Sequence, residues 1–249
     1  MRRFLLLSLL IGGVLASEAA LAYHFVPTEA EWTAWPDYCK ARYVTTQVGG
    51  SSPFSRRFST SQAAVWRNRL GDTAFTDIHH YCAGLAYMSR ARADIDPRSK
   101  KENLRHALAE TMYTFRQAPP STPIYAQMAG TAAQILTAMG RPEEAIDTAK
   151  TAIEAQPKQA APYVLLALLY RDQGKKKDAL DLLTQANTVT EGKSAEVLYN
   201  LGMVELELGD LEAAASHARE AYALGYPLPG LKKKLQAAGA WTEPKLTAN

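Results

Sequence analysis

Apolar residues in the carboxy-terminal half of the chain recur three and four positions apart, as they do on one face of an α-helix. The pattern itself repeats over three consecutive segments: Ala126–Gln159, Ala160–Lys193 and Ala195–Leu228. Each segment has two helical stretches separated by a glycine, and these glycines, Gly140, Gly174 and Gly209, lie 34 and 35 residues apart. The pattern therefore predicts three successive helical hairpins.

Small residues recur in register where the two helices of each hairpin would cross. The first helix carries Ala133, Ala167 or Gly202. The second helix carries two alanines seven residues apart: Ala145 and Ala152, Ala179 and Ala186, Ala214 and Ala221. Two helices approach closely only where both surfaces carry small residues. Because one hairpin cannot bury its own apolar face, we expect the hairpins to stack into a solenoid.

This spacing resembles the tetratricopeptide repeat (TPR) family. The segment Tyr199–Ala221 matches the family's Leu-Gly…Ala…Ala pattern best, and Pro157 stands where the family places a closing proline. Two features depart from the pattern: Glu205 replaces the usual aromatic residue, and the second repeat ends in Thr190–Gly192 instead of proline. The resemblance implies an all-α, right-handed α-solenoid of stacked hairpins. Together with the amino-terminal signal described below, it indicates an exported bacterial TPR protein.

An irregular fourth hairpin is predicted upstream, over residues 73–122. Gly84 takes the small crossing position and Ala107 the facing alanine, with a closing proline at Pro119. About eleven extra residues fall near Ser89–Lys101 relative to a regular repeat. Within them, Asp96-Pro97 is typical of a helix start or break.

Caps are expected at both ends of the stack. After the three repeats of residues 123–228, the segment 229–249 contains a short amphipathic helix whose Leu231 and Leu235 would cover the last hairpin. At the other end, residues 23–72 predict an aromatic-rich helical cap that starts with a capping box at Thr28 and Glu31. Within this cap, residues 45–62 are rich in glycine and serine and predict a flexible loop, which either stays on the surface or folds over the groove.

The first residues are typical of a secretory signal peptide. Arg2 and Arg3 precede the apolar run Phe4–Leu15, and Ala20–Ala22 gives a small-x-small cleavage site. We therefore expect residues 1–22 to be removed and the protein to be exported to the periplasm, with an uncleaved anchor as the alternative. The formal net charge of +3 predicts no nucleic-acid partner, and we expect no membrane span in the mature chain.

The chain has two cysteines, Cys39 and Cys82, which predict one disulfide in an exported protein. Loop-closure entropy at this separation corresponds to about 4 kcal/mol of stabilisation. The bond would pin the aromatic cap to the first helix of the irregular hairpin, on which His79 and Cys82 share a face. Free packed thiols, a metal site that adds His79 or His80, and a redox role remain alternatives.

We expect a binding function without catalysis and without a cofactor, because the sequence has no G-x-S-x-G, H-E-x-x-H or phosphate-loop motif. On helical phase, the first helices of the hairpins form a concave groove that suits an extended peptide or a partner helix. The predicted groove residues are Tyr81, Met88, Gln127, Gly130, Gln134, Val164, Leu168, Arg171, Tyr199 and Met203.

The main hypothesis is therefore a protein-binding adaptor of the cell envelope. These groove positions lack the Lys and Asn pattern with which some family members grip a terminal carboxylate, so that mode is not expected. Two alternatives remain: the groove residues pack against the chain's own 45–62 segment and bind nothing, or the protein is metal- or redox-responsive through Cys39, Cys82 and the histidines His79 and His80.

Overall fold

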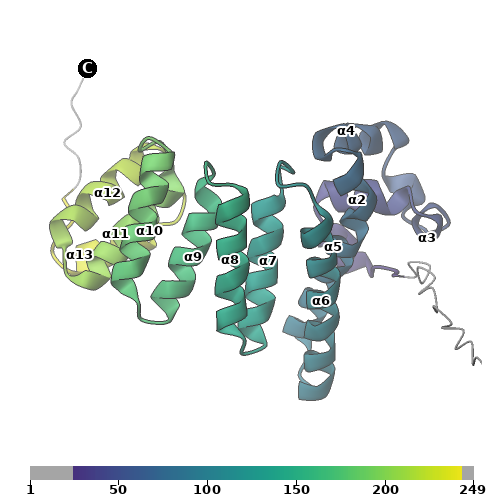
Figure 1. Ribbon diagram of the computed structural model, residues 1–249, viewed down its shortest axis with the longest axis horizontal. Helices are drawn as coiled ribbons and strands as arrows, with labels where there is room; N and C mark the ends of the chain where they lie inside the picture. The colour runs from purple at the N-terminus through teal and green to yellow at the C-terminus, as the bar shows by residue number, and fades with distance from the viewer. Residues whose placement is uncertain (1–24, 243–249) are drawn as a thin grey trace, which may run out of the picture.

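The computed structural model describes residues 25–242, and the regular structure among them is helical. The expected signal segment 1–22 and the last residues, 243–249, lie outside the described residues. No helix in the described range is long and apolar enough to cross a membrane. Figure 1 shows the helices stacked in one row, from a cluster of short helices at the amino-terminal end to α13 at the other.

Helices α5 to α12 form four antiparallel hairpins in chain order. Their bounds are α5 Asp72–Ala93 and α6 Pro97–Gln117, α7 Tyr125–Ala138 and α8 Pro142–Ala155, α9 Ala160–Asp172 and α10 Lys176–Val189, α11 Ala195–Leu208 and α12 Leu211–Ala223. The first helix of each hairpin packs against the second helix of the preceding one, so α7 contacts α6, α9 contacts α8, and α11 contacts α10. This arrangement confirms the predicted solenoid of stacked helix pairs.

The glycines between paired helices are required by the backbone of the turns. Gly140, Gly174 and Gly209 have φ of 72°, 77° and 91°, in the left-handed region that residues with a Cβ adopt only with strain. Each ends the first helix of its hairpin and lets the second start within a few residues. The 34-residue period is thus set by the positions at which the chain reverses.

Close helix crossing explains two further glycines. A Cβ on Gly84 would lie 2.4 Å from Thr111 Oγ1 and 3.1 Å from the carbonyl oxygen of Ala107. A Cβ on Gly202 would lie 2.7 Å from Leu231 Cδ2 and 3.0 Å from the carbonyl oxygen of Ala214. Both glycines therefore let two helix backbones approach at the predicted crossing points.

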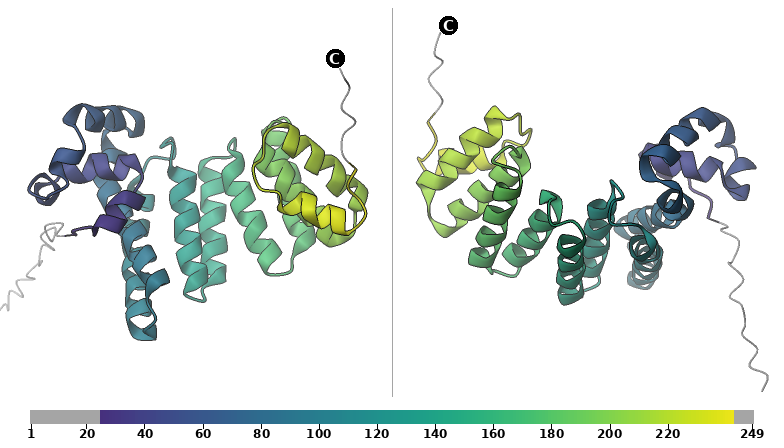
Figure 2. Two further views of the ribbon diagram at one scale, coloured as in Figure 1. Left: turned by 180° about the vertical axis from the view of Figure 1, so that it is seen from behind. Right: turned by 45° about the horizontal axis from the view of Figure 1, so that its top comes forward.

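The irregular hairpin α5–α6 is longer than the others and extends beyond α7 and α8 in the row (Figures 1 and 2). The extra residues near Ser89–Lys101 lengthen both helices and leave a short turn between them. Asp96 caps α6 by accepting a hydrogen bond from the Ser99 N–H at 2.8 Å, and Pro97 occupies the first turn. The predicted break at Asp96-Pro97 is therefore a helix start.

Short helices build the amino-terminal cap: α1 Glu29–Ala34, α2 Asp37–Val44, α3 Gln47–Gly50, η1 Ser55–Arg57 and α4 Thr60–Leu70. The predicted capping box is present, because Thr28 and Glu31 exchange hydrogen bonds at the start of α1. Aromatic side chains fill the interior of the cap, with Trp32 stacked on Phe54 at 4.7 Å and Tyr43 edge-on to Trp35 at 5.6 Å.

The prediction of a flexible loop at residues 45–62 is wrong. This segment contains α3, η1 and the start of α4. Phe54 and Phe58 are 6% and 8% exposed, because they pack into the aromatic interior of the cap. The glycine and serine residues lie in or near the turns between these short helices. The segment is folded because burying the two phenylalanines removes their apolar surface from water.

Helix α13, Gly230–Ala237, covers the other end of the stack. Leu231 and Leu235 are fully buried against the last hairpin, while Lys233 and Lys234 are exposed, as the amphipathic pattern predicted. Next to this cap, Glu205 stands at the position where the family usually has an aromatic residue. Its carboxylate lies 2.8 Å from His217 Nδ1 on α12, so a half-buried ion pair takes the place of an aromatic contact between α11 and α12.

Candidate functional site

The predicted disulfide joins Cys39 on α2 to Cys82 on α5. The two Cα atoms lie 5.5 Å apart, and both side chains are buried, at 0% and 1% exposure. The bond fastens the aromatic cap to the first helix of the irregular hairpin. Since both sulfur atoms are committed to it, neither is a free thiolate that could bind a metal ion.

The two histidines beside Cys82 interact with neighbouring helical groups. His79 Nδ1 lies 2.8 Å from the Thr76 carbonyl oxygen, and His80 Nδ1 lies 2.6 Å from Glu110 on α6. Burial, followed by the charges of His80 and Arg42, lowers the pKa of His79 to about 4, so this ring is neutral at pH 7. Within residues 25–242, no group of three or more His, Cys, Asp or Glu side chains is arranged to hold a metal ion.

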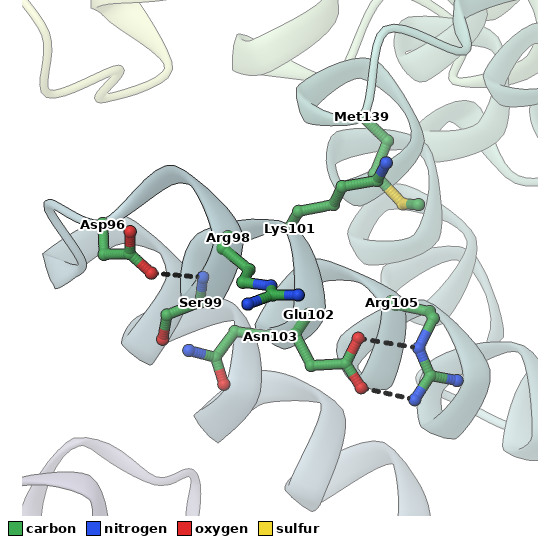
Figure 3. A pocket seen from close by; sticks show the side chains of 8 residues that line it. All are labelled: Asp96, Arg98, Ser99, Lys101, Glu102, Asn103, Arg105 and Met139. Atoms are coloured by element: carbon green, nitrogen blue, oxygen red, sulfur yellow. Dashed lines mark hydrogen bonds and ion pairs between the residues drawn. The ribbon is translucent and has the colours of Figure 1, made fainter.

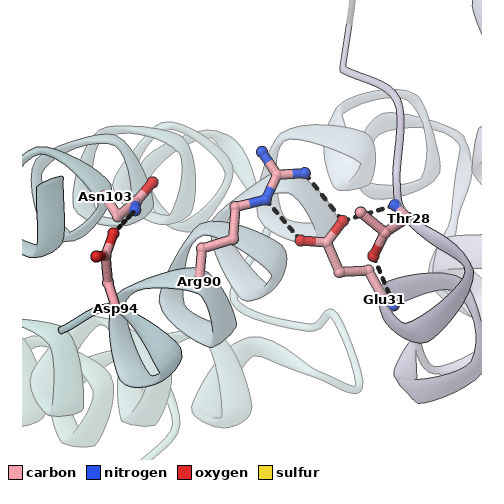
Figure 4. Close-up of polar contacts among 5 residues, drawn as sticks. All are labelled: Thr28, Glu31, Arg90, Asp94 and Asn103. Atoms are coloured by element: carbon pink, nitrogen blue, oxygen red, sulfur yellow. Dashed lines mark hydrogen bonds and ion pairs between the residues drawn. The ribbon is translucent and has the colours of Figure 1, made fainter.

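An ion pair forms a second tie between the cap and the solenoid (Figure 4). Arg90 on α5 donates from Nε to Glu31 Oε1 at 2.6 Å and from an Nη atom to Oε2 at 2.9 Å. Burial alone would raise the pKa of Glu31, but the hydrogen bonds from Arg90 and Thr28 and the charge of Arg90 together outweigh it and lower that pKa. The Arg90 guanidinium also lies over the rings of Phe25 and Tyr87, at 4.8 and 5.2 Å.

The first-helix face is the surface formed by α5, α7, α9 and α11, where the sequence predicted the groove. Four predicted groove residues are buried there and cannot contact a partner: Tyr81, Met88, Val164 and Met203, at 0%, 7%, 3% and 8% exposure. Each packs into a core cluster between helices or beneath a cap. The prediction is wrong at these positions. Helical phase shows which side of a helix a residue lies on, but it does not show whether neighbouring helices or a cap cover that side.

The chain's own caps occupy both ends of this face. At one end, Gln127 donates a hydrogen bond to the Tyr38 hydroxyl of α2 at 3.1 Å, and the Tyr81 hydroxyl lies 2.9 Å from Thr131 Oγ1 beneath it. At the other end, Tyr199 packs against the cluster that contains Leu231 and Leu235 of α13, and it stacks on Tyr226 of the preceding turn, with ring centroids 4.1 Å apart. Gln127 and Tyr199 are therefore contacts between the solenoid and its caps.

The middle of the first-helix face stays open, and four predicted residues lie there. A Cβ on Gly130 would meet no atom within 4 Å. Gln134 is exposed and accepts a hydrogen bond from Arg92 at 3.3 Å. Leu168 is half-buried, and Arg171 lies 3.8 Å from the Glu207 carboxylate. This open surface is more polar than the sequence predicted.

The sequence reasoning missed a groove on the opposite side of the hairpins, between the second helices α6 and α8. It has a volume of about 810 Å³ and a floor that includes Leu108, Met112 and Leu136. A second hollow of about 520 Å³ continues it along the amino-terminal turns of α6, and the two share Arg105. A signal was present in the sequence, because Arg98 and Lys101, which lie in or near the insertion, recur at helical spacing with Arg105 on one face of α6.

Comparisons with known proteins concern mainly the regular repeats. The sequence profile described as tetratricopeptide repeat matches residues 131–187 and 164–227. A comparison with curated protein sequences finds no match.

Among solved structures, the thermophilic TPR protein TTC0263 of Thermus thermophilus is similar, with 17% identity over 70% of this chain and 99% of that chain, and a TM-score of 0.47. A MamA structure (residues 41 to end) from Desulfovibrio magneticus RS-1 has 15% identity over 77% and 97%, with a TM-score of 0.44. Such low scores carry nothing about function. The profile match and the stacked hairpins agree that residues 131–227 form tetratricopeptide repeats.

Proposed function

We propose that the chain is a non-enzymatic scaffold of the cell envelope that binds a protein or peptide partner on the open middle of its first-helix face. One observation carries the proposal: the caps contact the face at both ends, through Gln127 and Tyr199, and leave Gly130, Gln134, Leu168 and Arg171 accessible between them. TPR proteins are generally protein-interaction scaffolds, and a rigid helical stack presents such a surface without rearrangement.

The chemistry of the open surface favours a peptide with mixed polar and apolar side chains. Leu168 offers apolar contact, while Gln134 and Arg171, the latter paired with Glu207, offer hydrogen bonds. The bare backbone at Gly130 lets a partner chain approach α7 closely. These features suit an extended segment or a small helix better than a small molecule, which would need an enclosed pocket.

Export is part of the same proposal. The amino-terminal residues are typical of a secretory signal, and a buried disulfide is the kind of bond that persists in an oxidising compartment. Cell fractionation, with amino-terminal sequencing of the purified protein, tests this part. We expect a periplasmic chain that begins near Tyr23. A chain recovered in the cytosol with its first residues intact would contradict it.

The binding surface is tested with a charged substitution at its centre. We expect Leu168→Glu to abolish recovery of a partner from envelope extract, because it places an unpaired carboxylate in the middle of the contact. The matched control is Thr184→Glu, an exposed position on α10, which should recover the partner as the wild type does. Circular dichroism checks that both variants are folded. If Leu168→Glu retains each wild-type partner, the surface is assigned wrongly.

A further inference from the structure

We propose a second docking surface on the other side of the solenoid: the α6–α8 groove binds an amphipathic helix of a protein partner through that helix's apolar face and an acidic edge. We define the groove by the residues of α6 from Arg98 to Arg116 that line it, by Leu136 and Met139 on its floor, and by the facing side of α8. This surface is distinct from the first-helix face and its binding partner.

The floor of the groove is apolar and incompletely covered. Leu136 is buried at its base, while Leu108 and Met112 on α6 are only half-buried beside it. Tyr113, also on α6, is 46% exposed at the rim. The volume of about 810 Å³ is large enough for several side chains of a partner. Apolar side chains that enter it would remove this surface from water, which is the main source of affinity in such contacts.

One wall of the groove carries a row of positive charges. The lining positions of α6 follow one face of the helix at steps of three and four: Arg98, Lys101, Arg105, Ala109, Met112 and Arg116. Figure 3 shows Arg98, Lys101 and Arg105 projecting from α6, with Met139 across from them. Arg105 is paired with Glu102 at 2.6 Å, whereas Arg98, Lys101 and Arg116 form no ion pair among the described residues.

The opposite wall carries two carboxylates, and these disfavour a nucleic acid. On α8, Glu144 is engaged by Arg141 at 2.6 Å, and Asp147, which Lys150 approaches to 3.9 Å, lies next to it along the groove. A phosphate backbone in the groove would face these carboxylates at close range, so the basic row alone does not define its partner. A protein helix can present acidic residues to α6 and neutral or basic residues to α8, and so match both walls.

The backbone of the groove favours a helix over an extended strand. Both walls are α-helices, whose N–H and C=O groups are bonded within each helix and offer nothing to a strand that needs external partners. A helix satisfies its own backbone. Helix α6 has 21 residues and is therefore about 31 Å long, enough for four turns of a partner helix to lie alongside.

The turn at the open end of the groove extends the docking surface. Ile95 between α5 and α6 is 98% exposed, although it is a large apolar residue. Its neighbour Asp94 fixes the turn, because it accepts hydrogen bonds from Ser99 Oγ and from Asn103 Nδ2, the latter at 3.2 Å (Figure 4). Because these hydrogen bonds fix the turn, the exposed isoleucine is in position to contact the end of a docked helix.

A displayed library of helical peptides tests the proposal. The library has fixed leucines along one face and randomised residues at both edges, and it is selected on the purified full chain with its disulfide intact. We expect enrichment of Asp and Glu at one edge. Binding of an enriched peptide, measured by fluorescence anisotropy, should weaken by about tenfold or more in Lys101→Glu/Arg116→Glu and as salt is raised. It should be lost in Met112→Glu.

Matched variants separate this surface from its alternatives. Lys177→Glu/Lys233→Glu makes the same charge change at exposed positions outside the groove and should leave peptide binding unchanged. Leu168→Glu should also leave it unchanged, so failure of the first-helix face and failure of the groove are distinguishable. The proposal is overturned if the selection gives no acidic enrichment, or if Met112→Glu binds the peptides as the wild type does. Sedimentation that shows self-association lost in Met112→Glu would identify a second copy as the occupant and also overturn it.

Discussion

The two ends of the solenoid are capped in different ways. The amino-terminal cap consists of several short helices around aromatic side chains, and it is held to α5 by the Cys39–Cys82 disulfide and by the Arg90–Glu31 ion pair. The carboxy-terminal cap is one eight-residue helix, α13, held by two buried leucines and by Trp241, which follows the helix and packs edge-on against Tyr222 of α12. One end relies on specific cross-links, whereas the other relies on the same apolar contacts that join the repeats.

The difference follows from what each cap can do by itself. Helices as short as α1 and α3, with six and four residues, are unstable alone and need fixed positions against a larger element. The α13 helix instead lies against the last hairpin where another repeat would, and so needs only an apolar side. We therefore expect the amino-terminal cap to be sensitive to loss of single cross-links, and the carboxy-terminal cap to be sensitive to loss of buried volume.

Removing the disulfide should have the largest effect. Cys39→Ala/Cys82→Ala releases a loop with a sequence separation of 43 residues, and loop-closure entropy predicts a loss of about 4 kcal/mol in the free energy of unfolding. Urea unfolding followed by tryptophan fluorescence measures it, because Trp32 and Trp35 lie inside the cap. Reduced wild type is the control and should behave like the variant. An unchanged midpoint in both would show that the cap is held without the bond.

Truncating a leucine should have the next largest effect, at the opposite end. Leu235→Ala removes a fully buried side chain between α13 and the last hairpin, and we expect a loss of about 3 kcal/mol there. Because repeats contact only their neighbours, hydrogen exchange should accelerate in α11 to α13 and stay unchanged in the amino-terminal cap. Acceleration throughout the chain would mean that the two ends are coupled more strongly than the contacts between hairpins imply.

Removing one partner of the ion pair should have an intermediate effect. Arg90→Leu leaves the Glu31 carboxylate buried without its partner, and we expect a loss of about 2 kcal/mol, below the range for fully buried pairs because Arg90 is partly solvated. Arg90 lowers the pKa of Glu31, so the pair stabilises the fold above the unfolded pKa near 4.5 and this contribution is lost as pH falls through the folded pKa. Acid titration of stability should therefore be shallower in Arg90→Leu. If the stability of Arg90→Leu falls as steeply with decreasing pH as that of the wild type, other carboxyl groups cause the acid sensitivity.

The smallest effect is expected from the ion pair beside the carboxy-terminal cap. The hydrogen bond to Glu205 raises the pKa of His217 above its ordinary 6.5, so the pair stabilises the last repeat below that pH and loses its effect as pH rises through the folded pKa. We expect a loss of no more than about 1 kcal/mol, since water partly screens the pair. Thermal unfolding across neutral pH measures it, with His217→Gln as the pH-insensitive control. A stability that rises with pH over this window would reverse the assignment.

The sequence predicted the repeats because their determinants are local. Gly140 and Gly174 mark chain reversals, and Gly84 and Gly202 mark crossings between helices that are close in the chain, so spacing alone located them. The disulfide was predictable because the chain has only two cysteines and one of them faces the cap. Residue spacing and residue chemistry are sufficient to predict these features, and the overall shape of the molecule is not required.

The candidate site was predicted less well because it depends on distant contacts. Gln127 meets Tyr38 across 89 residues of sequence, and no period in the chain encodes that the cap would cover one end of the face. Phe54 and Phe58 lie in a glycine- and serine-rich segment whose composition predicted a loop, although their burial requires the folded cap. The spacing of the basic residues on α6 is visible in the sequence. That they line a groove is not, because the groove exists only where α8 packs at a distance from α6.

The disulfide also has a mechanical consequence. If the chain is pulled from both ends until its helices unravel, the residues between Cys39 and Cys82 are shielded from the force, because the load passes through the sulfur atoms. At the contour length of an extended chain, 43 residues correspond to about 150 Å that the oxidised protein cannot release. Single-molecule stretching should show this difference in final length when a reductant is added. In the oxidised protein, most of α2, all of α3 and α4, and the first half of α5 remain inside an unloaded loop.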